Sequence, residues 1–264
     1  MLGNRAARRP FVSPMIAIHN LVKRYGSFTA VDDLTLDVAE GEIHGFLGPN
    51  GAGKTTTIRM IAGLLKPTAG RIEVNGHDLA KQPEAAKGSL GFIPDRPFIY
   101  EKLTAREFLR FHGGLYGFNG NSLETRIGEM LSMFELSKWE HELVESFSHG
   151  MKQRVVMSAA FLHRPRAVVV DEPMVGLDPR GARLIKDVFR RMSENGVAIL
   201  MSTHTLEVAQ EMCDRIAIIL RGKIIARGTV DELRGLAGSH DEQLTPVFLK
   251  LTGGSGLQEI DEII

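Results

Sequence analysis

Polar and hydrophobic residues alternate along the N-terminal part of the chain. The alternation runs through 16–25 (IAIHNLVKRY) and 30–38 (AVDDLTLDV), with a Gly-Ser turn between them. A period of two residues predicts two strands, each with one buried face. Residues 43–48 (IHGFLG) predict a buried strand, and the spacing of apolar residues in 55–65 predicts a helix that ends before Pro67.

The rest of the chain divides into a helical part and an alternating part. Between about 96 and 164 apolar residues recur at helical spacing, with hardly a strand signal, which predicts an inserted helical lobe. Its predicted helices are 101–117, 121–136 and 151–162. Elsewhere the predicted strands are 71–76, 90–94, 167–170, 197–203 and a hairpin over 216–228, and the predicted helices are 182–196 and 206–215. This alternation is typical of an α/β fold with a mostly parallel sheet flanked by helices.

These patterns predict three regions along the chain. Residues 1–14 contain three arginines and two prolines and are interpreted as a flexible arm. Residues 15–234 are expected to form the main domain, with its antiparallel β part first and the helical lobe inserted. Residues 235–264 form a Gly-rich extension with two short apolar patches. We expect these patches to pack on the chain's own sheet; pairing with a second subunit and regulation are the alternatives.

Composition narrows the class of protein. The 264 residues are 43% hydrophobic and 24% charged, which is typical of a soluble globular protein rather than a disordered one. The 32 basic and 32 acidic residues balance, so no net positive field favours nucleic acid. The one cysteine, Cys213, indicates a reducing compartment. No apolar run approaches the length of a membrane span, so work at a membrane would need a partner.

The segment GPNGAGKT, residues 48–55, fits the phosphate-loop motif and lies between a predicted strand and a predicted helix. Its glycines let backbone amides face a phosphate, Lys54 supplies a cation and Thr55 offers a hydroxyl to Mg²⁺. A glycine-rich turn capped by threonine is the structural alternative. No NKxD guanine-reading sequence occurs, which argues against a GTPase. The predicted nucleotide-binding residues are Gly48, Asn50, Gly51, Ala52, Gly53, Lys54 and Thr55.

Two further segments place polar residues directly after apolar strands. In AVVVDEP, Asp171 falls at the carboxyl edge of the sheet, where it can hold Mg²⁺ through water, and Glu172 can orient or deprotonate an attacking water. In MSTHTLE, His204 is predicted to donate to the γ-phosphate and the water. Alone, the Asp-Glu pair would be a turn and the histidine a packed or capping residue. The phosphate loop reverses that preference and makes Lys54, Glu172 and His204 the candidate catalytic residues.

The stretch FSHGMKQ, residues 147–153, adds a second anion site. Ser148 and Gly150 sit where a predicted helix begins, so a hydroxyl and free backbone amides face outward there. This site lies almost a hundred residues from the phosphate loop along the chain. The phosphate that it serves therefore needs an explanation.

Over about residues 15–230 the chain resembles the nucleotide-binding subunit of an ATP-binding cassette (ABC) transporter. The resemblance rests on five segments, which occur in the order GPNGAGKTT, SFSHGMKQR, VVVDEP, GLDPR and STH. The resemblance implies a P-loop NTPase core, ATP and Mg²⁺ as ligands, and 15–234 as the ABC ATPase domain. In that family two subunits close head to tail, and each signature segment caps the ATP of the other. Ser148 and Gly150 would therefore serve the partner's γ-phosphate.

The resemblance implies further roles. Tyr25 would stack on adenine, Thr56 would support Thr55 on the phosphates, and Asp178 would sit at the dimer seam. Capping of the helix that begins near Pro179 is the structural role of Asp178, and both roles are compatible. The family usually has glutamine where this chain has Asp95. Its carboxylate can still reach Mg²⁺ or the water, but it is shorter and adds negative charge.

The signature reads FSHGM where the commonest family form is LSGGQ, so His149 and Met151 are unusual. The SxGMKQR form and the late VFLKLTG resemble the type-two ABC export class. The implied partners are a second copy or a homologous ATPase subunit, and integral membrane subunits that dock near 95–118, on the cytoplasmic face of the membrane. Specific binding of nucleic acid is not expected. The alternatives are a soluble cassette ATPase acting in assembly or on nucleic acid, and a non-catalytic nucleotide-gated module.

Overall fold

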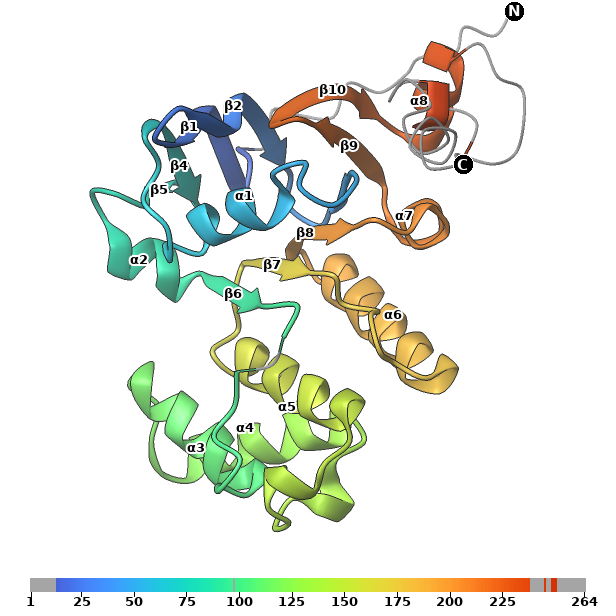
Figure 1. Cartoon of the computed structure of the whole chain (residues 1–264). Helices are drawn as coiled ribbons and strands as arrows, with labels where there is room; N and C mark the ends of the chain where they lie inside the picture. The colour runs from blue at the N-terminus through green and yellow to red at the C-terminus, as the bar shows by residue number, and fades with distance from the viewer. Residues whose placement is uncertain (1–12, 97, 238–244, 246–247, 251–264) are drawn as a thin grey trace, which may run out of the picture.

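The computed structural model describes residues 13–96, 98–237, 245 and 248–250, and contains two sheets and a helical lobe (Figure 1). Most of the predicted arm, 1–14, and most of the extension, 235–264, lie outside these residues, including half of its first apolar patch and all of the second. In the described part the α/β fold class predicted from the sequence is confirmed.

The smaller sheet is antiparallel. It contains β1 (Ile16–Tyr25), β2 (Phe28–Val38), β4 (Ala69–Val74) and β5 (His77–Asp78), in the order β2-β1-β4-β5. The predicted pair of N-terminal strands is therefore correct, with the turn between Tyr25 and Phe28. In β2 the buried residues Leu34, Leu36 and Val38 alternate with exposed ones, as the period of two requires, whereas in β1 Ile16, Ala17 and Ile18 are all buried.

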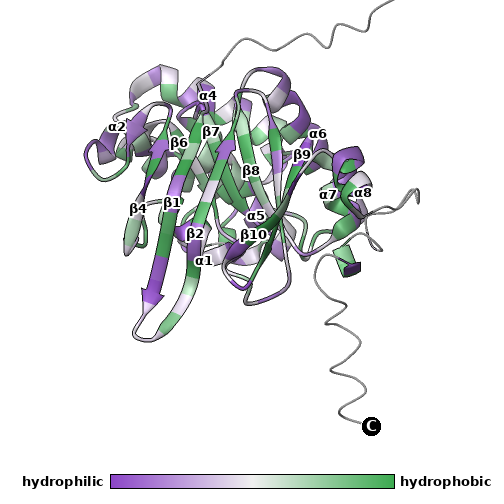
Figure 2. Cartoon of the chain, turned by 90° about the horizontal axis from the view of Figure 1, so that it is seen from above, coloured by the Kyte–Doolittle hydropathy of each residue, from purple (hydrophilic) through white to green (hydrophobic). Residues whose placement is uncertain are grey.

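The larger sheet has six strands in the order β10-β9-β3-β8-β7-β6, and every pairing except β9 with β10 is parallel. The strands are β3 (Ile43–Leu47), β6 (Leu90–Ile93), β7 (Ala167–Asp171), β8 (Ala198–Thr203), β9 (Arg215–Leu220) and β10 (Lys223–Gly228). Every residue of β3, β7 and β8 is buried, which explains their continuous apolar runs. Figure 2 shows this contrast in hydropathy between β7 and β8 and the alternating strands β1 and β2.

Helices cover both faces of the larger sheet. One face contributes to a core shared with the smaller sheet and with α1 (Lys54–Ile61), so α1 is buried between the two sheets. The other face packs on α6 (Pro179–Glu194), α7 (Leu206–Met212) and the lobe. α2 (Pro83–Gly88) and α8 (Val230–Ala237) complete the core. Cys213 lies in it, and burial raises the pKa of its thiol to about 12.

Besides two short 3-10 helices, Ser137–Trp139 and Val144–Ser146, the elements β5, α2 and α8 were not predicted. The helices α1, α3, α4 and α7 are shorter than predicted. β5 has only two residues, both polar, and the six residues of α2 carry no strong periodicity. α1 ends at Ile61 rather than at 65, because Gly63 takes a left-handed conformation with φ of +67°. The amide of Leu64 then donates to the carbonyl of Arg59, which closes the last turn of the helix.

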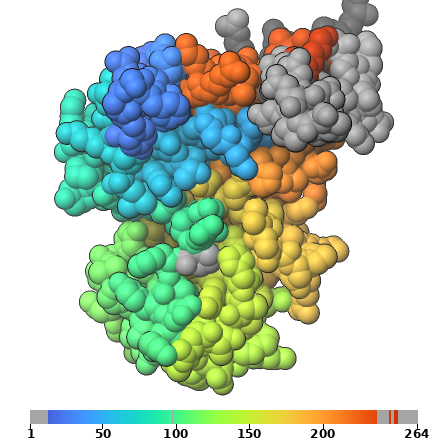
Figure 3. Space-filling view, viewed as in Figure 1, coloured from blue at the N-terminus to red at the C-terminus, as the bar shows by residue number. Residues whose placement is uncertain are grey.

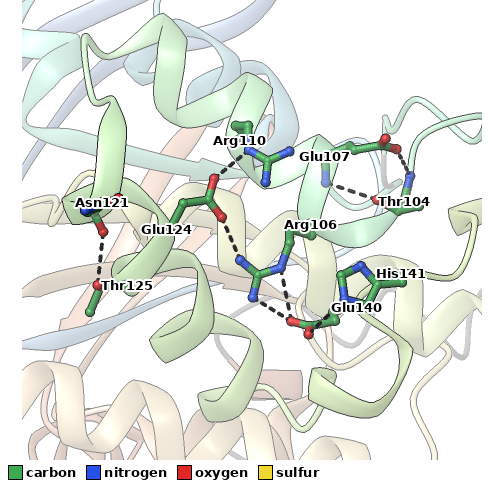
Figure 4. A network of polar contacts seen from close by, with 9 residues as sticks. All are labelled: Thr104, Arg106, Glu107, Arg110, Asn121, Glu124, Thr125, Glu140 and His141. Atoms are coloured by element: carbon green, nitrogen blue, oxygen red, sulfur yellow. Dashed lines mark hydrogen bonds and ion pairs between the residues drawn. The ribbon is translucent and has the colours of Figure 1, made fainter.

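The lobe contains α3 (Ala105–Leu115), α4 (Gly120–Met133) and α5 (His149–Leu162). The hydroxyl of Thr104 accepts from the amide of Glu107 and starts α3 in a reciprocal cap. Arg106 then pairs with both Glu124 of α4 and Glu140, at 2.7 Å each (Figure 4). These ion pairs set the packing of α3 against the rest of the lobe, while burial of apolar side chains supplies the stability.

Aromatic rings connect the lobe to the sheet core, against which it lies in the space-filling view (Figure 3). Phe161 of α5 packs on Phe134 in the lobe, with ring centroids 5.7 Å apart, and edge-on against Phe189 of α6, at 6.2 Å. Both Phe134 and Phe189 are fully buried. Phe161 thus contributes both to the packing inside the lobe and to the contact between the lobe and α6.

We expect Phe161→Ala to lower the free energy of unfolding by about 3–5 kcal/mol, because it leaves a cavity between the lobe and α6. Phe98, whose side chain is 83% exposed, provides the matched control, and Phe98→Ala should change stability by less than about 0.5 kcal/mol. Denaturant titration of the purified chain measures both. Equal stability of the two variants would contradict the packing described for Phe161.

Candidate functional site

The phosphate loop connects β3 to α1 at the carboxyl edge of the larger sheet. A side chain at Gly48 would place its Cβ 2.4 Å from the carbonyl oxygen of Ile219, and one at Gly53 would lie 2.6 Å from that of Ala30. Gly53 also has φ of +108°, and Gly51 has φ of +78°. Close approach to neighbouring backbone therefore requires glycine at 48 and 53, and a left-handed backbone conformation favours it at 51 and 53, which explains the glycines of the predicted motif.

Lys54 is the buried cation of the loop. Its side chain is almost covered, with the residue 6% exposed, and its ammonium donates to the carbonyls of Gly48 at 2.6 Å and Pro49 at 3.2 Å. Its Nζ lies 3.9 Å from Oε1 of Glu172. Burial lowers the pKa of Lys54, and the negative charges of Glu172 and Asp171 oppose that effect. The hydrogen bonds from the Lys54 ammonium thus fix the conformation of the phosphate loop.

The start of α1 offers hydrogen-bond donors to a phosphate. Thr55 and Thr56 are half-buried in its first turn, with Ala52 packed beneath the loop and Asn50 at its tip. The hydroxyl of Thr57 instead donates to the carbonyl of Gly53 and braces the turn. The free amides and hydroxyls of this turn can therefore bind an anion.

Asp171 and Glu172 follow β7 at the same edge. Asp171 is 2% exposed, and its carboxylate accepts a hydrogen bond from the hydroxyl of Ser202. Glu172 has φ of +49°, an uncommon conformation for a residue other than glycine. Its amide donates to both the carbonyl and the hydroxyl oxygen of Ser202, at 3.2 Å each. β8 therefore fixes the unusual backbone of Glu172 and so aims its side chain.

His204, directly after β8, lies beside Glu172, with its Nδ1 2.9 Å from Oε1 of the carboxylate. His204 is exposed, so its ring is accessible to a bound ligand. The structure brings Lys54, Glu172 and His204, the three residues predicted as catalytic, into one cluster. A cation, a carboxylate and an imidazole in this arrangement can bind a phosphate and orient a water molecule beside it.

The signature residues form a separate group. Ser148 caps α5, where its hydroxyl accepts from the amide of Met151 at 3.3 Å, and it is exposed. Asp178 caps α6 by accepting from the amide of Gly181 at 2.8 Å, so its predicted capping role is confirmed. Gly150 faces Leu177, next to Asp178. Among the described residues, no hydrogen bond or ion pair joins Ser148 to the phosphate loop.

In the part of the chain that the structure describes, Tyr25 and Asp95 make no hydrogen bond or ion pair with Lys54, Glu172 or His204. Tyr25 is 49% exposed at the end of β1, and the ammonium of Lys23 lies 5.1 Å from the centroid of its ring. Asp95 is exposed after β6, and its carboxylate accepts from the amide of Arg96. In the described part of the chain, no hydrogen bond or ion pair connects Asp95 with Thr55 or Asp171. The roles of Tyr25 and Asp95 therefore stay predictions.

The chemistry of the available donors fits Mg²⁺. Within the described ranges no three His, Cys, Asp or Glu side chains gather to hold a metal ion. Mg²⁺ keeps several waters and is held by one or two protein groups together with substrate phosphates. The hydroxyl of Thr55 and the buried carboxylate of Asp171 are such groups.

Two contributors to the site were not predicted from the sequence. Ser202 stands opposite Asp171 in the register of β7 and β8, and it holds both Asp171 and Glu172. The only sequence feature that could have indicated this role is the position of Ser202 two residues before His204, at the same end of the strand. Gln153 is buried in α5, and its amide donates to the carbonyl of Pro173 at 3.0 Å. No local pattern indicates that contact, because it joins segments that the fold alone brings together.

Comparisons with known proteins agree with this site. A family model described as ABC transporter matches residues 31–175. The chain is 39% identical, over 84% of its length and 71% of the relative, to a daunorubicin resistance ATP-binding protein of Streptomyces coeruleorubidus. It is 36% identical, over 90% of its length and 96% of the relative, to the ABC-type transporter ATP-binding protein EcsA of Bacillus subtilis.

Solved structures show the same fold. A structure of an ATP-binding subunit of an ABC transporter superposes with a TM-score of 0.84 at 35% identity, covering 90% of this chain and 99% of that one. A dimeric ATP-binding cassette bound to ADP and Pi, in a post-hydrolysis state, gives a TM-score of 0.75 at 24% identity, covering 82% and 99%. The chain therefore belongs to the ATP-binding subunits of ABC transporters and is an ATPase that uses Mg²⁺ and ATP.

Proposed function

We propose that two copies of this chain, or one copy and a homologous subunit, close head to tail around two ATP molecules and drive export through separate membrane subunits. One observation carries the proposal. Lys54, Glu172 and His204 cluster at the phosphate loop, while Ser148 presents an exposed helix start elsewhere in the same chain. Each chain thus holds two half-sites, which a head-to-tail pair completes.

Each residue has a distinct task in this proposal. Lys54 and the amides of the phosphate loop bind the β- and γ-phosphates, and Glu172 orients and deprotonates the attacking water. His204 holds the Glu172 carboxylate on one side and faces the γ-phosphate on the other. Thr55 and Asp171 would hold Mg²⁺, which neutralises phosphate charge when bound. Tyr25 stacks on adenine, and Thr56 supports the phosphate contacts.

The opposing subunit supplies the rest. The hydroxyl of Ser148 and the amides around Gly150, at the positive end of the 14-residue α5, cap the γ-phosphate across the seam. Asp178 sits beside that contact at the start of α6. ATP therefore favours the closed pair, and hydrolysis weakens it, because the negative charge that both subunits share is divided.

The membrane partner would dock in a cleft of about 810 Å³ between the lobe and the sheet core. Apolar side chains line its floor, with Arg59, Lys87 and Arg96 at its rim and Asp95 the acidic residue among them. In this proposal the Asp95 carboxylate, which replaces the family's usual glutamine, would face the partner. None of the helices in the described part of the chain could span a membrane. In this proposal the chain lies on the cytoplasmic face, held there by its membrane partner.

Export is favoured by the similarity to a daunorubicin resistance ATP-binding protein and by the SxGMKQR signature. The substrate named for that relative belongs to that protein and is not assigned to this chain. A soluble cassette ATPase is the competing function. No described feature of this chain favours it.

We expect Glu172→Gln to bind ATP but to hydrolyse it at least about a hundredfold more slowly, because the amide cannot accept a proton from water. The variant should accumulate as an ATP-dependent dimer in size-exclusion chromatography. Glu207→Gln is the matched control, since Glu207 is exposed on α7, and it should keep wild-type turnover. Near-normal turnover of Glu172→Gln would remove Glu172 from its catalytic role.

We expect Ser148→Arg to keep ATP binding by the single subunit but to abolish ATP-dependent dimerisation and turnover, since a long cation blocks the exposed start of α5. Ser122→Arg, at an exposed serine near the start of α4, is the control. Fluorescent-nucleotide titration and phosphate release measure the two properties. Loss of ATP binding by the monomeric variant would instead place Ser148 in its own subunit's site.

The membrane partner is tested by purification from detergent-solubilised membranes. We expect the tagged chain to retain an integral membrane protein and to lose it when Arg59, Lys87 and Arg96 are changed together to glutamate. The triple variant should still hydrolyse ATP in isolation. A wild-type chain that retains no membrane protein would favour the soluble alternative.

A further inference from the structure

A buried side-chain contact links the signature helix to the catalytic carboxylate of the same chain. Gln153, in the second turn of α5, is 1% exposed, and its Nε2 donates to the carbonyl of Pro173 at 3.0 Å. Its Oε1 is buried without a hydrogen-bond partner, which costs free energy. A side chain of similar size without polar atoms would avoid that cost. The contribution specific to glutamine is therefore the bond to Pro173.

That bond acts on the residue next to Glu172. The amide of Glu172 is held by Ser202 of β8, and the carbonyl of Pro173 is held by Gln153 of α5. The left-handed backbone of Glu172 lies between these two anchors. Since such a conformation persists only where its surroundings enforce it, a shift of α5 would change the aim of the Glu172 carboxylate.

The first turn of α5 contacts the other end of the same segment. A Cβ at Gly176, which has φ of +75°, would lie 2.9 Å from Cδ2 of His149, so the ring of His149 packs directly on this glycine. A Cβ at Gly150 would lie 3.2 Å from Cδ2 of Leu177. The 172–178 segment is therefore held by α5 near both of its ends. The signature form with glycine in place of His149 could not make the first of these contacts.

We propose that Gln153 and His149 are positioning residues, which transmit the contact of Ser148 with the partner's nucleotide to the Glu172 of their own chain. The proposal rests on the function proposed above. Ser148 caps the same rigid helix that carries both residues, so occupancy of one ATP site sets the geometry of the other. Two sites coupled in this way hydrolyse ATP cooperatively.

The test compares Gln153→Met, which keeps the length but removes the donor, and His149→Gly with the wild-type chain. We expect kcat to fall about tenfold in Gln153→Met, as one positioning hydrogen bond is lost, with the KM for ATP within about twofold of wild type. The Hill coefficient for ATP should fall toward one in both variants. The double variant should lose less than the product of the two single losses, because both residues hold one segment.

Ser158→Ala is the control, since it removes a buried hydrogen bond of the same helix, to the carbonyl of Arg154, away from the 172–178 segment. It should keep the wild-type kcat and Hill coefficient. In a Glu172→Gln background, Gln153→Met should still form the ATP-dependent dimer, which separates positioning from dimer formation. His149 is exposed, so His149→Gly remains a valid test if Gln153→Met does not fold.

An unchanged Hill coefficient in both variants, or a loss of kcat in Ser158→Ala equal to theirs, overturns the coupling. That result is distinct from failure of the proposed function. Without Glu172-dependent hydrolysis by the wild-type chain the proposed function itself fails. With it, unchanged variants contradict only the role of Gln153 and His149.

Discussion

The charge of Lys54 is the constraint around which the site is built. An ammonium group that is nearly excluded from water costs several kcal/mol unless it is compensated. Here two backbone carbonyls bind it, and the Glu172 carboxylate lies 3.9 Å away. That compensation requires the ends of β3 and β7 to meet at one edge, with β8 between them in the sheet. Because these three strands are parallel, their carboxyl ends lie at one edge of the sheet, and this brings Lys54, Glu172 and His204 together.

The sequence predicted the elements of this fold well, because their signals are local. The alternation in β1 and β2, the apolar runs of β3, β7 and β8, and the start of α6 at Asp178 are all properties of short segments. The early end of α1 was missed because its apolar spacing continues beyond Gly63. Only the conformation of that glycine stops the helix, and the pattern of hydrophobic residues carries no information about it.

For the site, the sequence identified the residue types but not how they hold one another. Lys54, Glu172 and His204 were expected to act on the same phosphate, and the structure adds that His204 binds the Glu172 carboxylate directly. The anchors at Ser202 and Gln153 depend on the register of two strands and on the docking of the lobe. Such contacts join residues 20 to 31 positions apart, so no local pattern encodes them.

The division of the binding groups explains why one chain alone is poorly suited to hold a triphosphate tightly. At its own phosphate loop a single subunit offers one buried ammonium, part of whose charge Glu172 and Asp171 already compensate. ATP adds several negative charges beside those carboxylates, so a lone half-site leaves repulsion unbalanced even with Mg²⁺ bound. In the proposed head-to-tail pair, the amides and the positive end of α5 from the opposing chain would supply the missing positive charge. If the pair closes as proposed, ATP already bound to one chain favours closure, because the closed site neutralises more phosphate charge than the half-site does, and this coupling is what a subunit would need in order to move a membrane partner.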